Sequence, residues 1–206
     1  MKQLIVALLL GLLSACGSSS TNTDAEYIPK PKGYPRIDLP PHRYVALEST
    51  HPYQFEVNQV ARVLPDTFAR SEPHWIFIHY PAFNASVQLT YKPILNDPNR
   101  LKAMLQDSYK LAGKHKIKAT AIREQVQRLP SGLYANVIEL EGEVPSQVQF
   151  ITTDTTRHFL RGALYFNTAI ANDSLAPVIQ YVKDDIRHLL NTLKWRKPAT
   201  VVIPQS

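Results

Sequence analysis

The chain has 206 residues, and its 23 Lys and Arg residues against 17 Asp and Glu residues give a formal net charge of +6. Nucleic-acid-binding proteins concentrate basic residues on one stripe, whereas here they are scattered along the sequence, so we expect no nucleic-acid partner. Cys16 is the single cysteine, which excludes an internal disulfide and a cysteine-based metal centre.

The N-terminus has the features of an export signal. Lys2 precedes an apolar run at residues 4–13, and at 1.5 Å per residue such a helix crosses only about half of a bilayer core. The string Leu13-Ser14-Ala15-Cys16 then resembles a bacterial lipobox. It predicts that Cys16 becomes the mature N-terminus and carries acyl chains, which hold a protein stably on a membrane. The alternative is an unmodified, buried thiol.

Composition divides the chain into four parts. Residues 1–15 are the predicted signal peptide, and their removal leaves 191 residues, enough for one domain with a core. Residues 16–44 contain lipidated Cys16, then a polar and a Pro-rich stretch, which we expect to form a tether. Residues 45–197 are expected to form a single α+β domain, and residues 198–206 a C-terminal tail.

Short alternating runs predict antiparallel strands after the tether. The expected strands cover residues 53–57, 61–64, 75–80, 86–91, 118–128, 133–140, 148–153 and 158–166. Residues 118–128 also fit a helix. Gly162, inside the last strand, indicates a bulge or a close backbone approach.

Two helices complete the pattern. Asp97-Pro98 is typical of a capped helix start, and the apolar spacing after it predicts a helix ending near Gly113. Residues 175–195 carry one apolar stripe, and we expect the charged face opposite to be solvated, with a docking surface as the alternative. The fold class that follows is α+β, an antiparallel sheet of about six to seven strands covered by helices.

No motif indicates catalysis. The sequence lacks His-x-His, His-Glu-x-x-His and Gly-x-Ser-x-Gly patterns, and its seven glycines form no phosphate-binding loop. His74 and His79 fall in one expected strand at an odd spacing, which sends them to opposite faces. We therefore expect structural or surface histidines, no catalytic residue, no metal site and no cofactor.

Two segments combine Arg with aromatic side chains, the residue types that dominate interface hot spots. One lies in the Pro-rich stretch and the other at an expected turn and strand. The candidate partner-docking residues are Lys32, Tyr34, Arg36, Asp154, His158 and Arg161. The alternative is an internal role, in which Arg161 pairs with Asp154 or caps carbonyls of the Pro-rich stretch.

Several long strings resemble the gliding-motility lipoprotein GldD family. They follow the lipobox and cover nearly the whole mature chain: Pro29-Lys30-Pro31-Lys32-Gly33-Tyr34-Pro35-Arg36, His51-Pro52-Tyr53-Gln54-Phe55-Glu56, Tyr80-Pro81-Ala82-Phe83-Asn84-Ala85, His158-Phe159-Leu160-Arg161-Gly162 and Asn172-Asp173-Ser174-Leu175-Ala176-Pro177. The resemblance implies surface gliding and the type IX secretion apparatus, and it transfers only Cys16 as a functional residue. The element order also resembles the Mog1/PsbP type of α+β sandwich.

These patterns lead to one functional expectation. We expect a non-enzymatic lipoprotein of the cell envelope, anchored to a membrane by lipid, with its domain in the periplasm. Its expected partners are that membrane and other gliding or secretion proteins. The alternative, supported by location and basicity, is a lipid-anchored cell-wall-binding module or hydrolase.

Overall fold

The computed structural model describes residues 37–48, 50–166 and 172–196. All of them belong to one compact unit, Pro35–Ser206. The predicted signal peptide, Cys16, most of the predicted tether and the predicted tail lie outside the described residues. Among the helices described, none combines the length and the apolar character needed to cross a bilayer.

A seven-stranded antiparallel sheet in the order β4-β5-β6-β10-β9-β8-β7 forms the centre of this unit. Its strands are β4 (Arg62–Pro65), β5 (Ile76–Tyr80), β6 (Ala85–Pro93), β7 (Ala119–Arg128), β8 (Tyr134–Gly142), β9 (Val148–Thr153) and β10 (His158–Phe166). Two small pairs accompany it: β1 (Tyr44–Ala46) with β3 (Glu56–Asn58), and β2 (Tyr53–Gln54) with β11 (Lys194–Trp195). The expected α+β class and strand number are confirmed.

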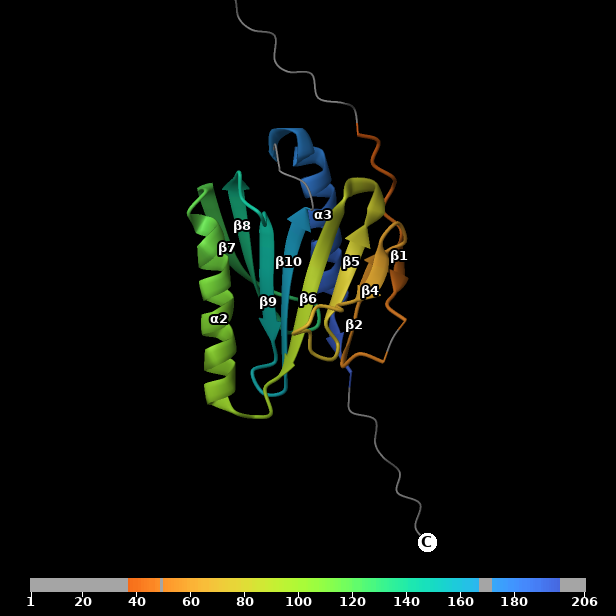
Figure 1. Cartoon of the computed structure of the whole chain (residues 1–206). Helices are drawn as coiled ribbons and strands as arrows, with labels where there is room; N and C mark the ends of the chain where they lie inside the picture. The colour runs from red at the N-terminus through yellow and green to blue at the C-terminus, as the bar shows by residue number, and fades with distance from the viewer. Residues whose placement is uncertain (1–36, 49, 167–171, 197–206) are drawn as a thin grey trace, which may run out of the picture. The chain divides into compact units, whose positions relative to one another are not determined.

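Helices α2 (Pro98–Lys116) and α3 (Asn172–Thr192) lie on opposite faces of the sheet (Figure 1). Neighbouring residues of one strand show this division: Leu160 packs in the core with α3, whereas Phe159 packs against Leu101 and Met104 of α2. The alternation follows from the two-residue period of a strand.

The main core lies between the sheet and α3. In β5 and β6 every second side chain is buried, including Ile76, Ile78, Val87 and Leu89. Each fully buried side chain of this kind contributes about 1.5–3 kcal/mol. On the other face, two smaller clusters pack beneath α2, so α3 covers the larger share of the core.

Several expected elements match closely, and others differ. The helix expected to carry its stripe through 175–195 runs from Asn172 to Thr192, and Lys194–Trp195 forms the short strand β11. Residues 118–128 form a strand, β7, which resolves the ambiguity left by the sequence. The expected strand at 53–57 divides at Phe55, because β2 pairs with β11 while β3 pairs with β1. The predicted helix end near Gly113 is wrong, since α2 continues to Lys116.

Gly162 marks a close approach rather than a bulge. A Cβ at this position would lie 2.2 Å from Cε1 of Phe150. The pairing of β10 with β6 and β9 passes through Gly162 without a register shift. The missing side chain therefore makes room for the Phe150 ring on the adjacent strand.

Gly113 lies inside α2, and a Cβ added there would meet no atom within 4 Å. We expect Gly113→Ala to raise the free energy of unfolding by about 1 kcal/mol, because Gly is the poorer helix former. The matched control is Gly162→Ala, which should lower stability by about 1–3 kcal/mol through overpacking against Phe150. Urea denaturation of the purified chain measures both. A neutral or destabilising Gly113→Ala would contradict the placement of Gly113 within the helix.

Candidate functional site

Four of the residues singled out from the sequence lie outside the described residues: Cys16, Lys32, Tyr34 and Arg36. The other three lie on the hairpin that joins β9 to β10. Asp154 is in its turn, and His158 and Arg161 are in β10. Lipidation of Cys16 stays a prediction, and so does a docking role for the other six residues.

Asp154 closes the β9–β10 turn with its side chain. Its Oδ1 accepts hydrogen bonds from the backbone amides of Thr156, Arg157 and His158 at 3.0, 2.8 and 2.8 Å. Burial alone raises the pKa of Asp154, but these three backbone donors outweigh it and hold the pKa below its usual value. The Asp154 side chain in its ionised form thus stabilises the hairpin.

His158 and Arg161 point to opposite faces of β10, as their odd spacing requires. The His158 ring stacks on Trp195 at 4.9 Å, its Nδ1 lies 2.9 Å from the Tyr91 hydroxyl, and burial lowers its pKa. Arg161 is only 7% exposed and donates from Nη2 to Oε1 of Gln149 at 2.7 Å. This hydrogen bond goes to Gln149 and not to Asp154, and the fold does not gather the side chains of Asp154, His158 and Arg161 on one surface.

The buried carboxylate of Asp185, which was not among the residues predicted from the sequence, connects α3 to three other elements. Oδ1 of Asp185 accepts from the Tyr44 hydroxyl at 2.9 Å and from His42 Nδ1 at 2.7 Å. Oδ2 accepts from the Tyr80 hydroxyl at 2.9 Å and from Asn58 Nδ2 at 3.0 Å. The side chain of Asp185 is 3% exposed, so these donors replace the water it has lost. Burial first, and then Asp185, raise the pKa of Tyr44 and of Tyr80 well above the usual range, which keeps both hydroxyls protonated.

Aromatic stacking extends this network to residues 37–46, which we call the leading segment. His42 stacks on Tyr181 at 4.1 Å, and Tyr44 stacks on His188 at 3.5 Å between ring centroids. His188 in turn bonds Glu56 at 2.7 Å. The cavity beside Asp185 measures about 10 Å³, which is no more than one water requires. The arrangement therefore serves to hold the leading segment on α3.

One sequence signal points to Asp185. Val182, Ile186 and Leu189 mark the apolar stripe of α3, and position 185 falls within that stripe at helical spacing. A carboxylate on an apolar stripe indicates a buried polar group with partners elsewhere in the fold.

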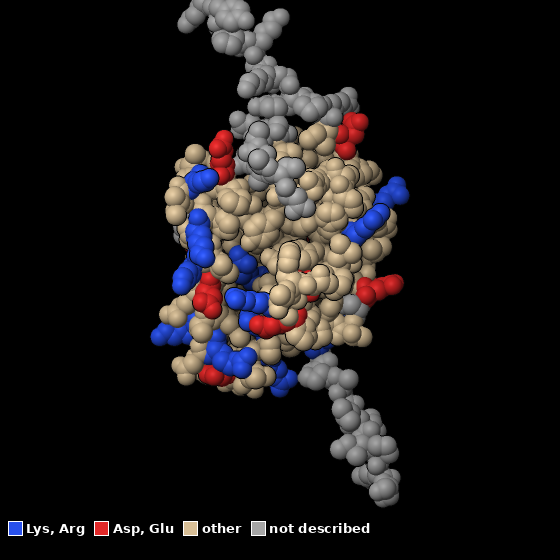
Figure 2. Space-filling model, in the orientation of Figure 1, with Lys and Arg blue, Asp and Glu red and all other residues tan. Residues whose placement is uncertain are grey.

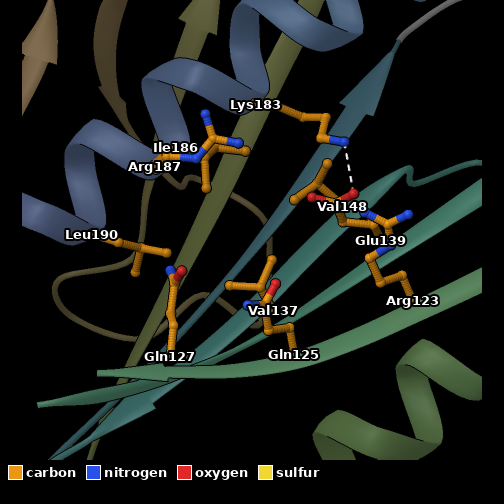
Figure 3. A pocket seen from close by; sticks show the side chains of 10 residues that line it. All are labelled: Arg123, Gln125, Gln127, Val137, Glu139, Val148, Lys183, Ile186, Arg187 and Leu190. Atoms are coloured by element: carbon orange, nitrogen blue, oxygen red, sulfur yellow. Dashed lines mark hydrogen bonds and ion pairs between the residues drawn. The ribbon is translucent and has the colours of Figure 1, made fainter. Parts of the chain in front are cut away.

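Besides the Asp185 network, the structure has a pocket of about 80 Å³ between β7, β8 and α3, shown in Figure 3. We call it the basic groove. Its floor is apolar, and its rim is polar and basic. The lining residues are Arg123, Gln125, Gln127, Val137, Glu139, Val148, Lys183, Ile186, Arg187 and Leu190.

Charges on the rim are partly paired. Lys183 bonds Glu139 at 2.7 Å, the dashed contact in Figure 3, and Arg187 bonds Asp184 at 2.5 Å. Arg123 makes no ion pair or hydrogen bond with the residues that the structure describes, although Glu139 faces it across the strand pair. Three cations against two carboxylates leave the groove with a basic excess.

Strand β7, which carries Arg123, is the last strand of the sheet. Its residues from Thr120 through Val126 are exposed. Arg123, Gln125 and Gln127 line the basic groove on the α3 side. Glu124 faces the other way and accepts from Tyr109 of α2 at 3.1 Å. The two faces of β7 therefore meet different surroundings.

Within the described ranges, no group of three or more His, Cys, Asp or Glu side chains is placed to hold a metal ion. The prediction that His74 lies in a strand is wrong: β5 begins at Ile76, and His74 has a φ of +71°. Its Nδ1 lies 3.1 Å from Nδ1 of His51. On the face seen in Figure 2, basic side chains predominate on the side where α2 lies, with a few acidic ones among them.

Comparisons with known proteins give two findings. The family described as gliding motility lipoprotein GldD matches residues 24–195. Among solved structures, the solution structure of cyanobacterial PsbP (CyanoP) from Synechocystis sp. PCC 6803 is similar over 79% of this chain and 98% of that chain, with a TM-score of 0.46 and 8% sequence identity. A comparison with curated proteins finds no match.

We expect Tyr44→Phe to lower the free energy of unfolding by about 1.5–3 kcal/mol, because it removes a hydrogen bond to the buried charge of Asp185. The phenyl ring can still stack on His188, so the loss isolates the hydroxyl. Tyr165→Phe is the matched control, since the Tyr165 hydroxyl makes no hydrogen bond within the described residues and its removal should leave stability unchanged. Equal stabilities of the Tyr44 variant and the unaltered chain would rule out the network as a major constraint.

Asp154 should also make the hairpin sensitive to acid. Because its pKa is lower in the folded than in the unfolded chain, its stabilisation is full above the unfolded pKa of about 4 and is lost as pH falls through the folded pKa. We expect Asp154→Asn to cost about 1 kcal/mol near pH 7, with the difference from the unaltered chain shrinking below about pH 4. Urea denaturation across pH measures this. A difference that does not change with pH would show that the charge is irrelevant.

Proposed function

Because the chain belongs to the GldD family of gliding motility lipoproteins, we propose that it is a non-enzymatic, membrane-anchored component of the gliding and type IX secretion machinery. It acts by docking onto other proteins of that machinery. Lipid chains on Cys16 hold it to a membrane of the cell envelope, and its α+β domain works in the periplasm. Lys32, Tyr34 and Arg36 contribute docking contacts from the tether.

The free edge of the sheet at β7 carries the docking part of this proposal. The strand is ten residues long and ends the sheet order. Soluble proteins usually shorten or cover such edges, since unpaired backbone groups invite pairing with another chain. Strand addition at a sheet edge is a recurrent way of binding a partner. A long exposed edge beside a basic groove therefore favours recognition of another protein.

The leading segment supports the anchoring part. It joins the domain to the residues that follow Cys16, and it is held on α3 by the contacts of His42 and Tyr44 with Asp185. Load applied through the tether thus reaches the main core rather than a loosely attached strand. Such an attachment suits a protein that must keep its position while bound to moving partners.

Replacing Cys16 tests the anchor and the function together. We expect Cys16→Ser to abolish incorporation of radioactive palmitate, to remove the protein from the membrane fraction and to stop colony spreading, because a chain without lipid has no stable membrane attachment. Ser18→Ala, two residues beyond the proposed lipid site, is the control and should behave like the unaltered chain. Normal spreading by cells whose Cys16→Ser protein is stable and unlabelled would contradict the proposed function.

A further inference from the structure

We propose that β7 binds an extended segment of a partner protein in which acidic and apolar residues alternate. The segment adds as a strand to the free edge, with its acidic side chains over the basic groove and its apolar side chains on the α2 side. This inference rests on the proposed docking function and names its surface and the chemistry of the partner.

The backbone of β7 presents a regular edge for this purpose. Its pairing with β8 has one irregularity, between Ala119 and Ala121, and then continues in register to Arg128. At about 3.3 Å per residue, the regular part spans roughly 25 Å. The outward amides and carbonyls along it can pair with an added strand, which supplies affinity that is independent of sequence.

The α3 side of the edge selects acidic side chains. Arg123 stands on β7 at one side of the basic groove, and Lys183 and Arg187 stand on α3 at the other (Figure 3). Arg123 is exposed and has no partner among the described residues. A carboxylate placed there forms a charge-assisted hydrogen bond without displacing an existing ion pair.

The α2 side of the edge selects apolar side chains. Ile122 and Val126 are 44% and 66% exposed, and they alternate with the groove-lining residues of β7. Tyr134 on β8 and Tyr109 on α2 add two more exposed aromatic side chains. Because side chains of an added strand alternate between the same two faces, the partner must alternate acidic with apolar residues.

Charge disfavours two other occupants. In an antiparallel two-fold pairing of β7 with a second copy, the axis is perpendicular to the sheet and the basic grooves of both copies lie on the same side, so Arg123 and its neighbours repel one another. The C-terminal residues 197–206 of this chain contain no Asp or Glu, so they lack the alternating acidic side chains that would pair with the cations of the groove. A different protein with an acidic strand satisfies both faces.

The test measures, by calorimetry, the affinity of a synthetic peptide of alternating glutamate and valine for the full lipidated chain in detergent. We expect binding, and we expect Arg123→Glu to weaken it about tenfold or more, because attraction becomes repulsion. Arg62→Glu, at an exposed arginine on the opposite edge strand β4, is the matched control and should leave affinity unchanged. Val126→Asp should weaken binding through the other face, and a lysine–valine peptide should not bind.

Hydrogen exchange locates the peptide. Amides of β7 should exchange more slowly in the complex while those of β4 do not change. No binding, equal weakening by Arg62→Glu, unchanged exchange at β7, or a dimer of the chain formed through β7 would each overturn the inference. In cells, Arg123→Glu should stop colony spreading. If cells with Arg123→Glu spread normally and cells with Cys16→Ser do not, strand addition at β7 is ruled out and the proposed function stands.

Discussion

The buried carboxylate of Asp185 is the constraint on which the arrangement of this domain depends. An ionised carboxylate without hydrogen-bond donors is very costly in a protein interior, so α3 packs stably only where four donors meet Asp185. These donors come from the leading segment, β3 and β5. Once Asp185 is fixed, the rotation of α3 is fixed too. Lys183 and Arg187, about 200° around the helix from it, are then turned toward the basic groove.

Local signals in the sequence predicted most of the fold, because strands and helices of this kind are encoded by short-range patterns. The expected strands at 148–153 and 158–166 agree with β9 and β10, and Asp97 caps α2 by accepting from the Asn99 amide at 2.9 Å. The Asp185 network was not predictable in this way. Its donors His42 and Tyr80 lie 143 and 105 residues away in sequence, and only the folded chain brings them together. The basic groove depends in the same way on packing between β7 and α3.

The function proposed above requires an attachment and a surface for partners, and the described residues offer a candidate for each beside α3. The leading segment is bonded to one side of the helix, through Asp185 and the rings of Tyr181 and His188. The basic groove and the β7 edge adjoin another side. Charged residues such as Arg123 and Glu124 on an exposed edge also discourage indiscriminate pairing. The same charges that protect the edge can therefore make it selective for a complementary strand.

The most direct test of the account is hydrogen exchange on the protein within its native assembly, purified from gliding cells, compared with the isolated lipidated chain. If the domain docks through its free sheet edge, amides of β7 exchange more slowly in the assembly, whereas amides of the opposite edge strand β4 exchange at the same rate in both samples. Equal exchange at β7 in the assembled and isolated protein, with protection appearing elsewhere, would contradict the account.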